Sequence, residues 1–212
     1  MIKLRVDDYP GTKPDEFWKH NYQNFKSFHD IIVTKFKTYR LGVIPCHVSY
    51  KDLEHLGALR EIEIALHGVN HDEKFPNEFR EYQTQNDIEY AIHRSLNHIT
   101  QSSRKIVKSY IPPHNVIDYK TISALKNCLI TDIHTGPGTE MSEMIYAEGA
   151  GLKVHDSRSP LHYGRTDEMM ERGCFPFLNE QIGDFYITLH WTWEFNIGLD
   201  SLKEFISKLE IR

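Results

Sequence analysis

The sequence has few cysteines and no long run of apolar residues. Only three cysteines occur among 212 residues, and Cys46, Cys128 and Cys174 lie too far apart for the paired spacings of structural zinc or redox sites. An odd, unpaired set of cysteines is typical of a reducing compartment. No apolar stretch is long enough to predict a transmembrane segment. The sequence therefore gives no sign of a disulfide-stabilised or membrane-spanning protein.

Excess basic charge is also lacking. Lys and Arg number 25 against 30 Asp and Glu, which gives a formal net charge of -5. Because nucleic-acid binding needs a clustered basic surface, this balance argues against nucleic acid as an obligate partner. Met1 leads directly into residues 2–6, the first predicted strand, with no charged leader before an apolar segment. We therefore expect a cytoplasmic protein that meets its substrate inside the cell.

Short apolar segments alternate with amphipathic segments along the chain. The predicted strands cover residues 2–6, 41–48, 63–66, 105–111, 129–133 and 185–189. The predicted helices cover residues 15–39, 51–59, 87–99, 117–126, 167–172 and 200–209. This alternation predicts an α/β fold with a mostly parallel sheet wrapped by helices, open or barrel-like. The length fits one domain over residues 1–212. Regular structure is hard to place over residues 136–165, which indicates either a functional loop or helices and strands that the pattern does not show.

Four polar segments follow predicted strands: Asp7-Asp8, residues 67–71, residues 110–115 and the segment ending at His190. In folds with parallel strands, ligands bind at the carboxyl ends of the strands. We therefore expect all four segments to meet at one rim of the sheet. No pattern in the sequence indicates an oligomeric state.

The first two segments predict a metal site. Consecutive side chains of a strand point in opposite directions, so Asp8 is expected on the metal and Asp7 beside a water molecule. His67 and His71 can share the same metal, and Gly68 favours a loop for this pair rather than a helix. Alone, the acidic pair fits a solvated turn equally well, and thirteen histidines can produce one such spacing by chance. Together, the residues predict a hydrolase with a divalent metal, best zinc, that activates water.

His190 ends an apolar segment and precedes Trp191-Thr192-Trp193-Glu194. Taken alone, it fits better as a core histidine hydrogen-bonded to the backbone. Its expected place at the same rim as the metal ligands favours a general acid instead, because an imidazole changes its charge near neutral pH.

These motifs, in this order, resemble those of the polysaccharide deacetylases, metal-dependent carbohydrate esterases that include chitin-oligosaccharide and peptidoglycan deacetylases. The resemblance covers residues 7–190. It implies a distorted (β/α) barrel of mostly parallel strands with surrounding helices, Asp7 as the catalytic base and His190 as the general acid. It implies metal binding by Asp8, His67 and His71. The residues expected to contact the substrate are Tyr9, Pro113, His114, Asn115 and Trp191, although packing in the core fits Trp191 equally well.

The sequence departs from the family pattern at three places. Gly68 follows the first metal histidine, where the family usually has Ser or Thr. Ile111 stands where the third motif usually has an arginine paired with the base. The fourth motif, an aspartate and a tryptophan that orient the acid histidine, is not evident, although Asp156 is a candidate for the aspartate. These departures indicate a divergent member with an unusual substrate, or an inactive relative.

The resemblance implies that the protein removes the acetyl group from an N-acetylated sugar or glycan precursor. Placement in the cytoplasm points to an intermediate of surface polysaccharide or lipopolysaccharide biosynthesis. Two alternatives stay open: a cytosolic metal-dependent amidase or esterase acting on a small non-sugar molecule, and a carbohydrate-binding protein that has lost catalysis. A third alternative is that the aspartates and histidines are polar residues that do not meet at one site. It predicts that the protein binds no stoichiometric metal.

Overall fold

The structure is a computed structural model that describes residues 1–12, 22–71, 77–157, 159, 161–180 and 184–210. Its strands are β1 (Ile2–Tyr9), β2 (Tyr39–Val43), β3 (Ile62–Leu66), β4 (Ser109–Tyr110), β5 (Asp132–Thr135), β6 (Lys153–Asp156) and β7 (Phe185–His190). They form one sheet in the order β6-β5-β4-β3-β2-β1-β7, and every neighbouring pair is parallel. All the carboxyl ends therefore lie at the same end of the sheet.

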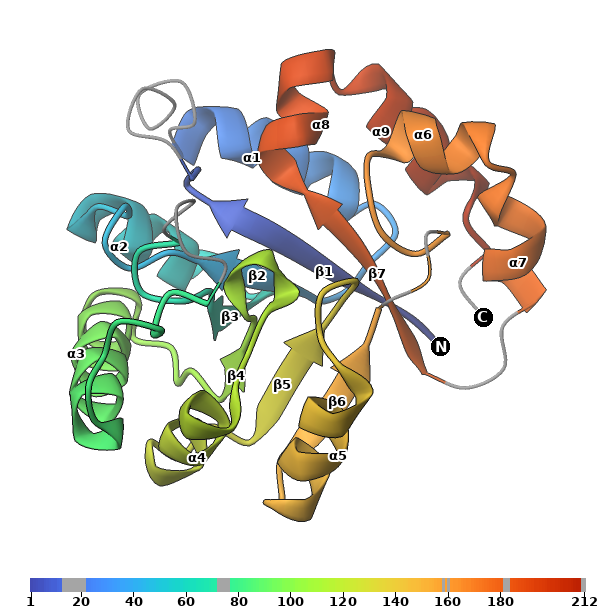
Figure 1. Ribbon diagram of the computed structural model, residues 1–212. Helices are drawn as coiled ribbons and strands as arrows, with labels where there is room; N and C mark the ends of the chain where they lie inside the picture. Colours follow the sequence, from blue (N-terminus) through green and yellow to red (C-terminus); the bar gives the residue numbers. More distant parts are fainter. Residues whose placement is uncertain (13–21, 72–76, 158, 160, 181–183, 211–212) are drawn as a thin grey trace.

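The sheet curls until its two edges nearly meet, and helices surround it (Figure 1). A parallel bridge between Tyr163 and Thr188 joins the segment after β6 to β7. Parallel neighbours cannot be joined by tight turns, so each connection crosses over the outside of the sheet, mostly as a helix. The expected distorted (β/α) barrel of mostly parallel strands is therefore confirmed.

Nine helices lie in the described part of the chain. They are α1 (Tyr22–Ile32), α2 (Tyr50–Ala58), α3 (Gln85–Ser103), α4 (Tyr119–Asn127), α5 (Met141–Gly149), α6 (Thr166–Glu171), α7 (Cys174–Glu180), α8 (Trp191–Ile197) and α9 (Asp200–Lys208). The start of α3 shows how local sequence sets these bounds, because Thr84 and Asp87 form a capping box there. Ile88, Ile92 and Ile99 then recur at helical spacing and are buried. No helix among the described residues is long and apolar enough to cross a membrane.

The largest difference from the sequence-based expectation concerns residues 136–165, where no regular element was placed. This segment contains α5 and β6, so of the two alternatives the second is correct: two elements were missed. The reason is weak patterning: α5 buries only Ala147, and no residue of β6 is fully buried. The predicted helix over residues 15–39 is confirmed over α1, and residues 15–21 of it lie outside the described residues. It is wrong for residues 33–39, because the helix ends at Ile32 and Tyr39 begins β2.

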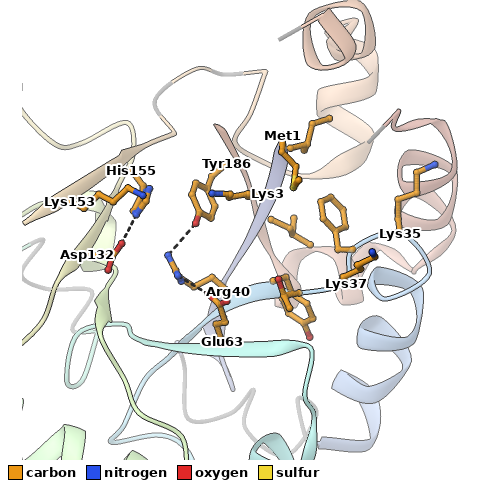
Figure 2. A pocket seen from close by; sticks show the side chains of 15 residues that line it. Met1, Lys3, Lys35, Lys37, Arg40, Glu63, Asp132, Lys153, His155 and Tyr186 are labelled. Carbon is orange, nitrogen blue, oxygen red and sulfur yellow. Dashed lines mark hydrogen bonds and ion pairs between the residues drawn. The ribbon is translucent and has the colours of Figure 1, made fainter. Parts of the chain in front are cut away.

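A cavity of about 600 Å³ opens at the amino ends of the strands (Figure 2). Both acidic side chains that line it are paired: Arg40 donates to Glu63 over 2.7 Å, and His155 lies 2.7 Å from Asp132. Arg40 also donates to the hydroxyl of Tyr186 over 3.2 Å. This cavity lies at the end of the barrel away from the predicted site residues.

Candidate active site

The opposite end of the barrel holds a cavity of about 460 Å³ formed by the carboxyl ends of the strands and the loops that follow them. The register places Asp7 on β1 directly beside His190 on β7. The loops after β3 and β4 contribute further side chains. Seven of the ten predicted site residues line this cavity: Asp7, Asp8, His67, His71, His114, Asn115 and His190.

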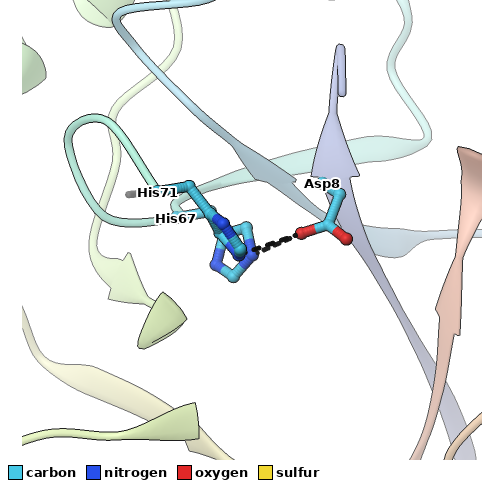
Figure 3. Close-up of side chains that lie close together, drawn as sticks. All are labelled: Asp8, His67 and His71. Atoms are coloured by element: carbon cyan, nitrogen blue, oxygen red, sulfur yellow. Dashed lines mark hydrogen bonds and ion pairs between the residues drawn. The ribbon is translucent and has the colours of Figure 1, made fainter. Parts of the chain in front are cut away.

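Asp8, His67 and His71 form a possible metal site (Figure 3). One potential ligand atom from each lies within 4.8 Å of the others, and all three residues are buried. Asp8 Oδ1 lies 2.8 Å from His67 Nε2 and 3.4 Å from His71 Nε2. Two imidazoles and a carboxylate are the ligand set of many divalent-metal hydrolase sites, which keep a further position open for water or substrate.

The hydrogen bonding of His67 supports this assignment. Its Nδ1 lies 2.9 Å from the carbonyl oxygen of Ile111, and a carbonyl only accepts, so Nδ1 carries the proton. In the neutral imidazole, Nε2 then has a lone pair aimed at the Asp8 carboxylate. Two acceptors at this distance require a cation or a proton between them. Metal-bound histidines are commonly held in this way, by a backbone carbonyl on the far nitrogen.

The charges around these ligands favour a bound cation. Burial raises the pKa of Asp8, but the charges and hydrogen bonding of His190, His67 and His71 outweigh it and hold that pKa below its usual range. Burial and the neighbouring His67 lower the pKa of His71 to about 4, which keeps this imidazole neutral. Burial has the largest single effect on the pKa of His67 and lowers it, but the hydrogen bond with Asp8, the charges of Asp7 and Asp8 and the hydrogen bond with Ile111 together raise it above its ordinary value. Without a metal, His67 and Asp8 share a proton that a divalent cation would replace.

Glu78 fixes the loop that carries the two histidines. Its carboxylate accepts hydrogen bonds from the three backbone N–H groups of residues 69–71, at 2.8, 3.1 and 3.3 Å. Gly68 has φ +64°, and a Cβ there would lie 2.4 Å from Pro113 Cγ and 2.5 Å from Glu78 Oε1. The loop therefore requires glycine at position 68, where the family pattern has Ser or Thr. No sequence pattern indicated Glu78, because it lies seven residues beyond the second histidine without a recognisable spacing.

Arg5 pairs with the predicted base. Its Nε and Nη2 donate to Asp7 Oδ1 and Oδ2 over 2.8 and 2.6 Å, and both side chains are almost completely buried. This bidentate geometry is the strongest form of an arginine–carboxylate contact. Ile111 stands where the resemblance led us to expect an arginine, and β1 itself supplies the guanidinium from two residues upstream. The sequence analysis treated Arg5 only as part of the first strand.

His190 is held by two side chains that the sequence analysis did not assign to it. Its Nε2 lies 3.1 Å from the hydroxyl of Tyr163, and its ring stacks on Trp193 with centroids 3.8 Å apart and an angle of 14°. The same Nε2 lies 4.0 Å from Asp7 Oδ2 and 3.9 Å from Asp8 Oδ2. Burial lowers the pKa of His190 below its ordinary value. Asp156, which the sequence suggested as the orienting group, is exposed on β6.

Two predicted substrate contacts lie in the core instead. Tyr9 and Trp191 are both 0% exposed, and each packs against Phe25, with ring centroids 4.8 and 5.5 Å away. Trp191 also donates its indole N–H to the carbonyl oxygen of Asp8 over 3.2 Å. The structure therefore corrects the expectation that Tyr9 and Trp191 contact a substrate. They support the backbone of the acidic pair, where Asp8 adopts φ +67°.

The third motif gives a mixed result. His114 and Asn115 line the cavity, whereas Pro113 is buried beneath the glycine of the histidine loop and Pro112 reaches the cavity in its place. This corrects the expectation for Pro113. The ring of His114 lies 4.6 Å from that of His71. Asn115 is 5% exposed, and its amide oxygen accepts from Arg5 Nη2 over 3.0 Å.

The sequence matches no protein-family model and no curated protein. The structure, in contrast, is similar to several solved structures over 98% of the chain. A Mycobacterium smegmatis protein assigned to the polysaccharide deacetylases has a TM-score of 0.70 at 12% identity, with 82% of its chain covered. A family 4 carbohydrate esterase from Streptomyces lividans, solved with acetate, has a TM-score of 0.56 at 10% identity, with 84% covered.

A third similar structure is a mutant of a Bacillus anthracis pseudoenzyme of the same carbohydrate esterase family, with restored enzymatic activity. Its TM-score is 0.56 at 13% identity, and this chain spans 61% of its length. At these identities the comparisons establish the fold. The protein has the distorted barrel fold of the family 4 polysaccharide deacetylases, and this barrel holds a buried Asp-His-His group.

Proposed function

We propose that the protein is a metal-dependent deacetylase that hydrolyses the N-acetyl group of a sugar or glycan precursor. The observation that carries the proposal is the convergence of Asp8, His67 and His71 at the carboxyl end of a deacetylase-type barrel. A divalent cation held there, which we propose to be zinc, would polarise the acetyl carbonyl and lower the pKa of a bound water.

Asp7 is the proposed base. It lines the cavity next to Asp8, and Arg5 holds both of its oxygens, so its orientation is fixed before substrate enters. A pre-oriented carboxylate can accept the proton of the attacking water without reorganisation. His190, on the neighbouring strand, is the proposed acid that supplies the proton for the departing amine. The products are acetate and a free amino sugar.

His114 and Asn115 line the cavity and are proposed to face the substrate. Trp193, 40% exposed and stacked on His190, offers a further aromatic edge at the same opening. We also propose a cytoplasmic location and a role in the synthesis of a surface polysaccharide or lipopolysaccharide. The three free cysteines support a reducing compartment.

The proposal is tested by metal analysis of freshly purified protein together with acetate release from a panel of N-acetylated sugars and nucleotide-sugars. We expect about one divalent ion per chain. Asp8→Asn should lower the metal content and abolish acetate release, whereas His155→Asn, in the amino-end cavity, should change neither. If the wild-type protein binds metal but cleaves only small non-sugar amides, the proposed sugar substrate is wrong and the protein is a metal-dependent amidase. Sugar binding without acetate release, even with metal added, would identify an inactive relative.

A further inference from the structure

The cavity at the amino end of the barrel is lined by more basic than acidic side chains (Figure 2). The chain as a whole has the opposite balance, with a formal net charge of -5. A hollow lined by charge of one sign concentrates ions of the other sign. This end of the barrel is therefore suited to an anion. The two acidic side chains are Glu63 and Asp132, and the five basic ones are Lys3, Lys35, Lys37, Arg40 and Lys153.

Two of the basic side chains already have acidic partners. Lys3 Nζ lies 2.6 Å from Asp184 Oδ2, and Arg40 Nη2 lies 2.7 Å from Glu63 Oε2. A paired charge is largely offset by its partner, so neither pair supplies much free positive charge to the cavity. The free positive charge comes from the other three basic side chains.

Lys35, Lys37 and Lys153 are these three, and none of them makes a hydrogen bond or ion pair with a residue that the structure describes. Figure 2 shows Lys153 on one side of Arg40, and Lys35 and Lys37 on the other. Lys37 and Lys153 are exposed, and Lys35 is half-buried. Each ammonium group ends a flexible four-carbon stem, so all three can turn toward a ligand that enters between them.

Two stacked histidine rings at this end respond to the basic side chains. Burial lowers the pKa of His134 well below its ordinary value, and the charges of Arg40, His155 and Lys153 lower it further. Burial also lowers the pKa of His155; the hydrogen bond with Asp132 raises it, and the charges of Arg40 and Lys153 oppose that rise. The positive charges therefore act on the interior of this end of the barrel, where an anion would offset them.

The interior between the two cavities is filled by side chains. Arg5 Nη1 donates to the carbonyl oxygen of His134 over 3.2 Å, and the ring of His134 contacts Arg40. Arg5 and His134 are both 0% exposed. No residue lines both cavities. A ligand at the amino end therefore occupies a site separate from the proposed metal ligands.

We propose that the cavity at the amino end binds a small molecule that carries phosphoryl groups, held by Lys35, Lys37 and Lys153. A volume of about 600 Å³ is typical of small-molecule sites. A phosphoryl group carries about -1.5 to -2 charges near neutral pH and three acceptor oxygens, whereas a carboxylate has one charge and two oxygens. Three ammonium groups, each with three donors and no acceptor, match the phosphoryl group better. This site does not depend on the proposed deacetylation.

The test measures the binding of uridine diphosphate, pyrophosphate and uridine to the purified protein by isothermal titration calorimetry. We expect both phosphate compounds to bind and uridine not to bind. The affinity should fall as salt is raised, because salt screens exposed charges. A triple variant, Lys35→Gln/Lys37→Gln/Lys153→Gln, should bind pyrophosphate at least about 10-fold more weakly, since it loses charge-assisted hydrogen bonds.

The matched control is a second triple variant that removes the same charge from α2 and α4, away from the cavity. It should bind pyrophosphate as wild type does. Asp8→Asn should also bind it unchanged, because the proposed metal ligand lies in the other cavity. The control triple variant is Lys51→Gln/Lys120→Gln/Lys126→Gln.

Three results would overturn the inference: no binding of either phosphate compound at millimolar concentration, equal losses in the two triple variants, or a loss in Asp8→Asn alone. A second measurement uses the wild-type protein without any substitution. In ¹H–¹⁵N NMR spectra, pyrophosphate should shift the amide signals of residues 35–40 and 153–155. Shifts confined to residues 67–71 and 114–115 would place the phosphate at the carboxyl end and contradict the proposal.

Discussion

The cavity at the amino end of the barrel is larger than the one at the carboxyl end, about 600 against about 460 Å³. Both contain carboxylates and histidines. At the amino end each acid has a partner of opposite charge or a donor of its own: Glu63 pairs with Arg40, and Asp132 with His155. At the carboxyl end, two imidazoles converge on the single carboxylate of Asp8.

This difference separates groups that satisfy one another from groups arranged for a ligand. A pair such as Arg40–Glu63, with Glu63 half exposed, is complete in itself and contributes little to stability. A buried carboxylate facing the lone pair of an imidazole is incomplete until a cation or proton lies between them. Ligand groups that lack a cation or proton between them therefore indicate the candidate catalytic end of this barrel better than cavity size does.

The largest effect should come from the carboxylates themselves. Asp7→Asn removes the proposed base but keeps the three metal ligands, so kcat should fall by about 10²–10⁴-fold at an unchanged metal stoichiometry. Asp132→Asn makes the same change at the amino end, where the carboxylate is paired with His155, and should leave turnover intact. Acetate release and metal analysis measure both. If Asp7→Asn turns over substrate at the wild-type rate, Asp7 is not the catalytic base.

Arg5 and Arg40 should differ in how much each contributes to the free energy of unfolding. Arg5 is fully buried, so Arg5→Met leaves Asp7 buried without its counter-charge and should cost about 3–5 kcal/mol of unfolding free energy. Arg40→Met should cost clearly less, because the partner Glu63 becomes free to be solvated. Urea unfolding of both variants gives the comparison. Adding Asp7→Asn to Arg5→Met should recover part of the loss, and the absence of any recovery would argue against a direct charge effect.

A smaller effect should appear in the pH dependence of stability. Glu194, in α8 just after His190, is fully buried and accepts hydrogen bonds from the N–H and hydroxyl of Thr166 at 2.8 and 2.5 Å. Burial raises its pKa from 4.5 to about 7, more than these hydrogen bonds lower it. The folded protein therefore keeps a proton that the unfolded chain has lost.

The stabilisation by this proton is fully present below pH 4.5 and is lost as the pH rises through about 7. Thermal melts of metal-free protein between pH 5 and 8 should show a decline of roughly 2–3 kcal/mol. Glu194→Gln should lack most of this slope. Asp184→Asn, at the exposed amino end beside Lys3, should keep it. Identical slopes in wild type and Glu194→Gln would exclude Glu194 as the source.

The alternation of strands and helices was enough to predict a mostly parallel sheet, open or barrel-like, and the residues that meet at its rim, because parallel strands bring their carboxyl ends together whatever the separation in the chain. The choice of a distorted barrel depended on the resemblance of the motifs to those of the polysaccharide deacetylases. Partners such as Arg5, Glu78 and Tyr163 were not predictable. Arg5 sits inside an apolar strand, and Tyr163 lies in the segment that showed no regular pattern. Their contacts depend on register and loop geometry rather than on spacing. Trp191 was misplaced because an aromatic residue at a strand end suits the core and a sugar face equally well.

The last comparison concerns the loop between the two histidines. Glu78→Gln should weaken metal binding by about 10–100-fold, the usual cost of losing a group that orients metal ligands. Its carboxylate accepts hydrogen bonds from three consecutive backbone N–H groups. The side-chain NH₂ group of a glutamine is itself a donor, so it cannot accept the hydrogen bonds of the N–H groups that it faces. Titration with zinc against a competing chelator measures the change. The matched control is Glu63→Gln. The Glu63 carboxylate accepts a hydrogen bond from Arg40 at the other end of the barrel, so this variant should bind metal as wild type does. If both variants bind alike, His67 and His71 are positioned by the strand and the Ile111 carbonyl alone, and the loop contributes nothing to the site.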